Sequence, residues 1–554
     1  MDSSASAAPS DINNSEPVES NEKTVNETIL DTAPIPTANA QGDENEPKYL
    51  GAWQSLPIAV AMGLAIFITG LDDSIVGTAT PTITNEFHSL TDIGWYGSAY
   101  RLTTCSTQFF YGKIYEKFRV KWVLVIAVTI LELGSIVSAA APSSAAFIIG
   151  RAISGCGASG IITGVFIAIA HTIPLRLRPI YNSTVGALEC IAAIVAPIIG
   201  GALTTYASWR WCFWLNLPVG GFTIFILIVC FKDSENQKIP EGSTISKLKQ
   251  LSFLNLFVFT GSIVCFLLAL QWGGSTFSWG SGRIIALLVI AGFAFAAFVA
   301  LEALRKDSAV IPRSVVFNKT VMLCVLYAFC ASAAFNLSDY FLPIWFQAIT
   351  GASAAKSGQM LLPSVIALSA AAISSGFILS VVGYYTPVML LGSTMMAIGF
   401  GFLTTFKPTT GVSAWIGWQV MYGLGMGLAI PQPWSATSTA LKSEDIPAGM
   451  TAIAFGISTG AALFISISQN IFSNVLRQRL SNIPDIDVDS VFNQGATNLL
   501  DGVPASDKAQ VVGAYNFAVT RTFWSCVAVV CLGIVAALGM DWNSVKKTKK
   551  DESA

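Results

Sequence analysis

Residues 52–77, AWQSLPIAVAMGLAIFITGLDDSIVG, decide the class of fold. A helix needs about 20 apolar residues to cross the hydrocarbon core of a bilayer, and this stretch supplies them before its only charged residues, Asp72 and Asp73. Helices and closed barrels are the structures that satisfy their own backbone hydrogen bonds in lipid. The stretch therefore predicts a membrane-spanning helix that carries an acidic pair near its end.

Similar apolar stretches recur along the chain and predict 14 spans in all. By residue number they are 52–77, 93–112, 122–141, 146–171, 181–206, 213–231, 252–272, 282–301, 320–344, 357–379, 386–405, 414–436, 449–473 and 518–540. The composition agrees, because 53% of the 554 residues are apolar, 12% are charged and the mean hydropathy is +0.61. Soluble domains are about 25% charged. We predict an all-α polytopic membrane protein.

The positive charges predict its orientation, because cytoplasmic loops retain Lys and Arg. With the N-terminus inside, the inner segments hold 21 of the 31 Lys and Arg residues and the outer loops hold 7. Both termini are therefore expected in the cytoplasm. Residues 1–48 hold ten acidic residues and no aromatic one, which predicts a disordered tail, and residues 546–554 form a second tail. The long outer loop, 474–517, is polar and is expected to be partly helical.

The sequence lacks the residue patterns that are typical of enzymes, ATP-driven transporters and metal sites. The sequence has two histidines, no His-Glu-X-X-His, and no Gly-X-X-X-X-Gly-Lys-Ser/Thr for binding nucleotide phosphates. Its ten cysteines fall mostly in apolar runs and include no Cys-X-X-Cys pair. We expect no enzyme activity, no ATP-driven transport by this chain, no metal and no cofactor.

Charged residues inside spans are informative, because lipid tolerates them only with a partner or water. They are Asp72, Asp73, Arg101, Glu132, Arg151, Glu189 and Asp339. Successive helical residues point about 100° apart, so one of Asp72 and Asp73 is expected to face a central cavity and the other a neighbouring helix. A carboxyl group in such a cavity can exchange a proton. For Asp72 and Asp73, the alternative to proton exchange is a fixed ion pair, such as an aspartate with Arg101. For Glu132 and Glu189, the alternative is an ion pair or a side chain that snorkels toward the membrane surface.

Small residues predict close helix packing in three spans. They are Gly155, Gly157 and Gly160 in the fourth, Gly186, Gly200 and Gly201 in the fifth, and Gly423, Gly425 and Gly427 in the twelfth. Pro197 is expected to kink the fifth span just before its glycine pair. Such stripes occur in most packed membrane bundles and alone indicate no function.

Several motifs together resemble the major facilitator superfamily, and within it the fourteen-span drug:proton antiporters of the fungal toxin and multidrug efflux branch. Residues 71–83, LDDSIVGTATPTI, resemble that group's LDxTIVxxALPxI signature and place Asp72 on its aspartate. Arg151 matches the arginine of the span-four RxxxGxG pattern, to which the family assigns proton coupling. Residues 208–218, SWRWCFWLNLP, are the most specific match to the fourteen-span group.

Two further segments resemble family motifs with substitutions. Residues 112–121, GKIYEKFRVK, are similar to the loop GxLaDrxGrk, with Glu116 on its aspartate and Arg119 on its second glycine. Residues 186–201 resemble the antiporter motif GxxxGxxxxxGPxxGG, although Cys190 and Ala196 replace two glycines and Glu189 adds a charge. Residues 340–347 and 358–363 resemble the family's second half. The resemblance covers about residues 50–542.

The resemblance implies an arrangement of domains and a set of site residues. Residues 49–231 and 311–545 would form two pseudo-symmetric six-helix bundles around a central site, with an inserted helix pair in 232–310. Proton coupling is expected at Asp72, Asp73, Arg151 and Glu189. Cavity or substrate contacts are expected at Arg101, Tyr100, Glu132, Asp339, Asn336, Trp345 and Gln347. Conformational motifs are expected at Gly112, Glu116, Arg119, Gly186, Pro197, Gly200 and Gly201.

The function that this resemblance implies is export of small amphipathic organic molecules in exchange for protons, by alternating access. The expected partners are a small-molecule substrate, protons and the lipid bilayer, with no nucleic acid, and the chain is expected to be a monomer. The plasma membrane is the expected location, with the vacuolar membrane as the alternative. Proton-coupled uptake, for instance of an iron–siderophore complex, and a non-transporting receptor are the rival functions.

Overall fold

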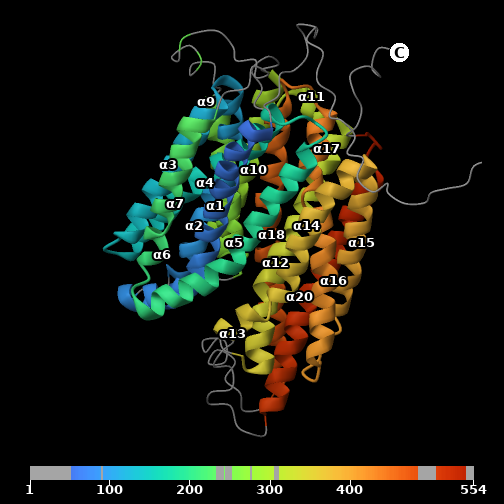
Figure 1. Ribbon diagram of the computed structural model, residues 1–554. Helices are drawn as coiled ribbons and strands as arrows, with labels where there is room; N and C mark the ends of the chain where they lie inside the picture. Colours follow the sequence, from blue (N-terminus) through green and yellow to red (C-terminus); the bar gives the residue numbers. More distant parts are fainter. Residues whose placement is uncertain are drawn as a thin grey trace, which may run out of the picture. The chain divides into compact units, whose positions relative to one another are not determined.

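The computed structural model describes residues 52–88, 92–231, 243, 247, 253–274, 277–304, 311–352, 354–483 and 507–544. These residues form helices and no named strand (Figure 1). The first half contains α1 (Ala52–Phe87), α2 (Ile93–Lys117), α3 (Val120–Ala139), α4 (Ser144–Thr172), α5 (Arg178–Tyr206), α6 (Trp211–Trp214) and α7 (Asn216–Cys230). The predicted tails, 1–48 and 546–554, lie outside the described residues, as do most of 232–252 and the segment 484–506.

The second half begins after a helix pair, α9 (Phe253–Trp272) and α10 (Gly282–Leu304). Its helices are α11 (Arg313–Val316), α12 (Lys319–Thr350), α13 (Ala354–Gln359), α14 (Leu362–Val382), α15 (Tyr385–Leu403), α16 (Val412–Ala429), α17 (Gln432–Ala440), α18 (Ile446–Leu480) and α20 (Lys508–Leu538). In Figure 1, α11 and α17 lie near the upper end of the helices and α13 near the lower end.

Among the described helices, 12 are long and apolar enough to cross a bilayer. The chain is thus a polytopic helical membrane protein. Helices α2 and α16 occupy predicted spans but are not among the 12. Helix α2 carries Arg101 and three charged residues near its C-terminus, and α16 is 18 residues long with four glycines.

Several predicted span boundaries were wrong, and proline explains one of them. The span predicted at 414–436 is two helices, because α16 ends at Ala429 and α17 begins after Pro431, whose missing N–H cannot continue the helix. The span predicted at 213–231 is made of α6 and α7, joined at Leu215. Helix α1 runs ten residues beyond the predicted end of its span, to Phe87.

The packing pairs of α1–α7 recur among α12–α20. In the first set, α1 packs on α5 and α7, α2 on α4, and α3 on α4 and α7. In the second set, α12 packs on α18 and α20, α14 on α16, and α15 on α16 and α20. The two sets meet where α2 packs on α18 and where α14 packs on α5. These two junctions are equivalent, because α2 in the first set corresponds to α14 in the second, and α5 corresponds to α18. We call them the first set and the second set below.

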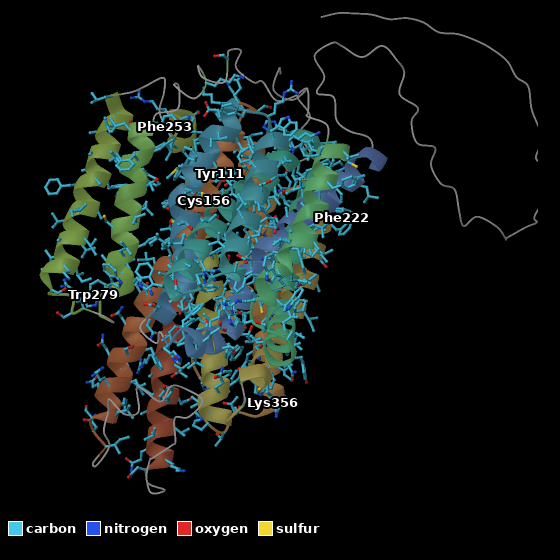
Figure 2. All side chains as sticks on the ribbon, turned by 90° about the vertical axis from the view of Figure 1, so that its left-hand side faces the viewer. Tyr111, Cys156, Phe222, Phe253, Trp279 and Lys356 are labelled. Atoms are coloured by element: carbon cyan, nitrogen blue, oxygen red, sulfur yellow. The ribbon has the colours of Figure 1, made fainter. Side chains whose placement is uncertain are left out.

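Helix α9 packs on α10 and lies against α2 and α18, where the two sets meet. The ring of Phe259 on α9 lies 5.1 Å from that of Phe109 on α2 and 5.5 Å from that of Phe455 on α18. Figure 2 shows the two helices side by side at the left of the view, with Phe253 near the upper end of the pair and Trp279 near the lower end. Most of α10 faces outward and is apolar, as expected of a surface that contacts lipid.

Contacts between the two sets include a group at the end where α2 meets α3, called here the α2–α3 end. Phe166 of α4 stacks on Trp434 of α17 with ring centroids 3.7 Å apart. Asn182 of α5 donates a hydrogen bond to Ser435 at 3.3 Å, and Arg178 donates one to the backbone carbonyl of Ser438 at 3.5 Å. These contacts hold the two sets together at this end.

The predicted close approach of glycines is confirmed for two of the three spans. A methyl group at any of the three positions in α4, or the three in α16, would collide with the backbone or a side chain of a neighbouring helix. In α5, Gly200 lies against Ile75 and Thr78 of α1. The prediction was wrong for Gly186 and Gly201, because a methyl group at either position would meet nothing.

Candidate functional site

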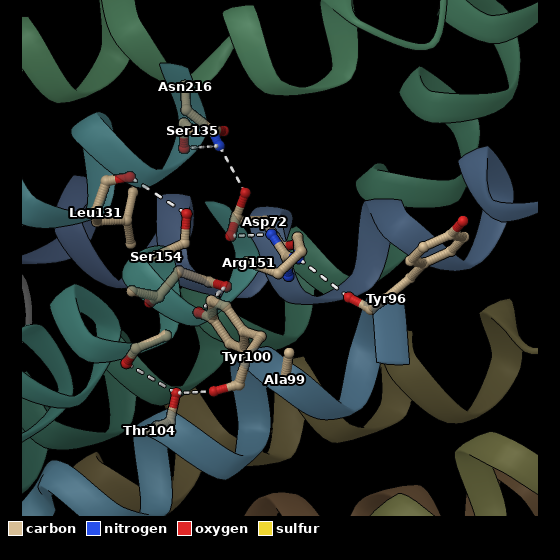
Figure 3. Close-up of polar contacts among 12 residues, drawn as sticks. Asp72, Tyr96, Ala99, Tyr100, Thr104, Leu131, Ser135, Arg151, Ser154 and Asn216 are labelled. Atoms are coloured by element: carbon tan, nitrogen blue, oxygen red, sulfur yellow. Dashed lines mark hydrogen bonds and ion pairs between the residues drawn. The ribbon is translucent and has the colours of Figure 1, made fainter. Parts of the chain in front are cut away.

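The two adjacent aspartates of α1 belong to different networks. Asp72 and Arg151 have side chains that are 0% exposed, and an Oδ2–Nη1 distance of 2.6 Å joins them (Figure 3). The other guanidinium nitrogens of Arg151 donate to the backbone carbonyls of Asp72, at 3.1 Å, and Tyr96, at 3.3 Å. A buried charge is tolerated when it is paired and hydrogen-bonded, and this pair meets both conditions.

Helix α7 supplies a third member of this network. The amide of Asn216, which is fully buried, donates to Asp72 Oδ1 at 2.8 Å and to Ser135 Oγ of α3 at 3.0 Å (Figure 3). Both carboxylate oxygens of Asp72 are therefore engaged, one by Arg151 and the other by Asn216. Asn216 lies within the motif 208–218, but sequence reasoning gave it no role. Its contact depends on where α7 packs against α1, which the sequence pattern does not show.

Tyr100 completes the surroundings of Arg151. The guanidinium lies 4.6 Å from the centroid of the Tyr100 ring, within the range of a cation–π interaction. The Tyr100 hydroxyl donates to the backbone carbonyl of Thr69 at 3.3 Å. Tyr100 was predicted to line a cavity, but it is buried between α1, α2 and α4 and covers the ion pair.

The second network contains Asp73 and joins the two sets of helices. Arg101 of α2 donates to Asp73 Oδ2 at 2.8 Å and to the Asn336 Oδ1 of α12 at 2.7 Å. The side chains of Arg101 and Asp73 are 38% and 26% exposed, in contrast to the sealed first network. Asn336, predicted as a cavity or substrate contact, thus lies on the opposite set and accepts a hydrogen bond from Arg101.

Glu189 of α5 and Asp339 of α12 extend this second network. Both side chains are exposed, although each lies in the middle or outer part of a long helix. Glu189 lies within the electrostatic range of Asp73 and Arg101, and Asp339 within that of the same two groups. The cluster therefore holds three carboxyl groups and one guanidinium, contributed by α1, α2, α5 and α12, in a place that solvent reaches.

Three predicted cavity residues lie elsewhere. Trp345 is 0% exposed and its indole donates to Asn516 of α20 at 2.8 Å, so it packs in the core of the second set. Gln347 donates to Ser357 of the short α13 at 3.0 Å. Glu132 is 8% exposed on α3, inside the first set. Trp345 and Glu132 are thus buried on faces of α12 and α3 that pack against other helices, and their predicted contact with a substrate stays a prediction.

The conformational motif between α2 and α3 lies at the α2–α3 end. Glu116 pairs with Lys113 at 2.6 Å and with Lys117 at 3.5 Å. Gly112 lies against Thr451 of α18, where a methyl group would collide with the threonine side chain. The backbone of Arg119 has φ −64°, a conformation that any residue can adopt. The position therefore does not need the glycine that the family motif has there.

A polar contact outside the spans joins α1 to the connection between α5 and α6. Glu86 accepts hydrogen bonds from the indole of Trp209 at 2.6 Å and from Arg210 at 2.7 Å. The hydrogen bond from Trp209 is the main cause that lowers the pKa of Glu86 from its ordinary value, and Arg210 adds to it. Trp209 and Arg210 belong to the motif 208–218, whose role here is to anchor the end of α1.

This arrangement of helices and charges agrees with one family. The model of the Major Facilitator Superfamily matches residues 62–467. The chain belongs to the Major Facilitator Superfamily. The match contains both polar networks and the junctions between the two sets of helices.

Curated members of the superfamily align with nearly the whole chain. The MFS-type transporter VdtG of Byssochlamys spectabilis is 42% identical over 502 residues, which cover 91% of this chain and 90% of VdtG. The MFS-type efflux pump MFS1 of Arthroderma benhamiae is 40% identical, covering 90% and 93% of the two chains. The efflux pump aflT of Aspergillus parasiticus is 40% identical, covering 89% and 96%.

Solved structures share the superfamily fold at low sequence identity. The proton:xylose symporter XylE superposes with a TM-score of 0.58 at 15% identity, covering 90% of this chain and 99% of XylE. The human organic anion transporter MFSD10 gives the same TM-score at 11% identity, covering 86% and 99%. At these identities the likeness extends to the fold alone.

Proposed function

We propose that this superfamily member exports small amphipathic organic compounds in exchange for protons. The direction of transport is supported by curated relatives at about 40% identity that are named efflux pumps. The substrate that we propose is a toxin, a secondary metabolite or a drug. The chain is proposed to act as a monomer in the plasma membrane, without a metal or cofactor.

The architecture that we propose for this function has 14 spans. The first set supplies six, with α6 and α7 counted as one, and the second set supplies six. Helices α9 and α10 are the inserted pair, and α2 and α16 are the two spans that are less apolar than the rest. The recurrence of the same packing pairs in both sets supports two pseudo-symmetric bundles. Both termini are placed in the cytoplasm by the distribution of Lys and Arg.

The observation that carries the proposal is the bridge from Asp73 through Arg101 to Asn336. It lies deep in the spans, it is accessible to solvent, and it connects the two sets that must move relative to each other in alternating access. Substrate or proton binding in this cluster would change the attraction between the sets. We assign Asp73, Arg101, Glu189, Asn336 and Asp339 to the central site on this basis.

The buried pair is proposed to couple the proton to this movement. A proton on Asp72 would remove the counter-charge of Arg151, leaving a guanidinium that is fully buried and unpaired. Breaking a buried ion pair costs about 3–5 kcal/mol, which is enough to favour another arrangement of helices. Arg151 itself keeps its proton at any relevant pH, so it adjusts the aspartate rather than carrying the proton.

The conformation seen here fits one state of that cycle. The α2–α3 end is cytoplasmic in the proposed orientation, and the contacts of Phe166 with Trp434 and of Asn182 with Ser435 close the junction there. The state would therefore be closed to the cytoplasm. Proton-driven return would break these contacts. One proton gains about 1.4 kcal/mol for each pH unit and about 2.3 kcal/mol for each 100 mV. A pH difference of about two units and a potential of about 100 mV therefore supply roughly 5 kcal/mol per proton.

The experiment that tests the function compares fungal strains that lack, carry or overproduce the chain. An exporter predicts that the deletion strain retains its own secondary metabolites and becomes more sensitive to amphipathic antifungals, while overproduction has the opposite effects. Lower accumulation in the deletion strain would instead indicate the rival function, proton-coupled uptake. Equal accumulation in all three strains would contradict transport of the compounds tested.

A further inference from the structure

Glu132 of α3 is a buried acidic group that the proposed mechanism does not use. Its side chain is 8% exposed, and neither carboxyl oxygen has a hydrogen-bond partner. It lies against Gly220 of α7, where a methyl group would collide with the carboxyl group. One helical turn away on α7, the carbonyl oxygen of Asn216 is also buried and without a partner. This interior region of the first set therefore has three acceptor oxygens without a hydrogen-bond partner.

The charges around Glu132 oppose a second negative charge there. Asp72 is the charged group whose field reaches Glu132. On α4, which packs against α3, Arg151 is committed to Asp72. Helices α6 and α7 contain no charged residue, and their titratable groups are Cys212 and Cys230. On α2, Arg101 is committed to Asp73 and the other charged residues lie at the α2–α3 end.

We propose that Glu132 is a second proton-binding site of the first set, occupied in this conformation and coupled to the charge on Asp72. A buried carboxylate with no hydrogen-bond partner and no cation beside it is costly, whereas the neutral acid costs much less and carries a donor of its own. The ionised Asp72 favours the proton on Glu132, and neutralising Asp72 weakens that preference. The site thus deepens the proposed proton coupling, because it links the protonation of two carboxyl groups inside one bundle.

Infrared spectroscopy of the purified full-length protein tests occupancy of the site directly. A protonated carboxyl group gives a carbonyl band distinct from that of a carboxylate. We expect such a band at neutral pH in the wild type, its loss in Glu132→Gln and a shift in frequency in Glu132→Asp. An unchanged band in both variants would show that Glu132 is ionised and would overturn the proposal. The spectra need no transported compound, so a failure of the proposed function would leave this result intact.

The coupling to Asp72 has its own matched control. In Asp72→Asn, the Glu132 band should disappear on alkaline titration at a midpoint about one pH unit lower than in the wild type, since the opposing charge is gone. In Asp73→Asn the midpoint should stay unchanged, because Asp73 belongs to the other network. Equal midpoints in wild type and Asp72→Asn would contradict the coupling.

The contact with Gly220 offers a structural test with an adjacent control. Gly220→Ala should displace the Glu132 carboxyl group, alter its infrared band and lower Tm, whereas Gly221→Ala should change neither, because a methyl group there meets nothing. Adding Glu132→Ala to Gly220→Ala removes the collision and should restore Tm. If Gly220→Ala matches Gly221→Ala in both band and Tm, the buried position of Glu132 is wrong and the proposal fails.

Discussion

Asp72 and Asp73 show how one helical step separates two roles. Asp72 is sealed against Arg151 and Asn216, whereas Asp73 is half-buried and reaches the second set through Arg101. The difference in direction could be predicted from the 100° rotation per residue. The sequence does not predict which arginine pairs with which aspartate, because both arginines lie at similar depth on neighbouring helices.

Asp72→Asn should abolish proton-coupled export; the unpaired Arg151 should lower Tm, but the protein should still insert into the membrane. The amide has the shape of the carboxyl group but cannot exchange a proton near neutral pH. The measurement is uphill transport in proteoliposomes, with Asp73→Glu as a variant that keeps an exchangeable acid on α1. Uphill transport by Asp72→Asn would move the coupling role to Asp73 or Glu189.

The stability of the buried pair should be non-additive. Arg151→Gln alone leaves Asp72 buried without a cation and should cost about 3–5 kcal/mol, seen as a fall in Tm of the detergent-solubilised protein. The double variant Asp72→Asn/Arg151→Gln removes both charges and should be more stable than Arg151→Gln. If the two single losses simply add in the double variant, the pair is not the interaction seen here.

At the scale of the helices, α2 packs tightly against α18 at Gly112, whereas α5 is open at Gly201. Gly112→Ala should collide with Thr451 and cost this closed conformation about 1–3 kcal/mol, so that transport slows about tenfold. Thr451→Ala removes two of the three atoms involved and should restore part of the rate. Gly201→Ala is the control, because that position is open. Equal rates for Gly112→Ala and Gly201→Ala would refute the close junction.

The contact of α1 with the α5–α6 connection should depend on pH. Because the pKa of Glu86 is lowered, its stabilising contribution is complete above the ordinary value of 4.5 and is lost as the pH falls through the lowered pKa. The Tm difference between wild type and Glu86→Gln should therefore be present at neutral pH and disappear once the pH falls below the lowered pKa of Glu86. Trp209→Phe removes the main hydrogen bond that lowers the pKa of Glu86. In that variant the contribution of Glu86 to stability should therefore be lost at a higher pH than in the wild type. A difference that persists in acid would contradict this account.

Helix positions could be predicted from the sequence more reliably than helix contacts. Apolar length located the spans, but Pro431 divided one of them and the glycines of α5 did not all pack. The acidic and basic residues were found because lipid makes them conspicuous. Asn216 was missed, since an uncharged residue in a motif indicates no partner. The burial of Trp345 in the core of the second set could not be predicted, because aromatic residues pack in cores as readily as they line cavities.

The whole molecule combines a superfamily fold with two polar networks of different exposure. One lies within the first set and is closed to solvent, and the other joins the two sets and is open to it. Helix α9 lies where α2 meets α18, so a relative movement of the sets must take place beside it. This division assigns proton coupling to the closed network and the central site to the open one.

The central claim is exchange of an organic compound for protons, and proteoliposomes with an imposed pH gradient test it most directly. The account predicts that purified wild-type protein accumulates a fluorescent amphipathic dye on the acidic side, against the dye's own gradient. A protonophore should abolish this accumulation, and Asp72→Asn should lack it. Accumulation on the alkaline side, with dye and protons moving together, or accumulation that ignores the pH gradient, would contradict the account.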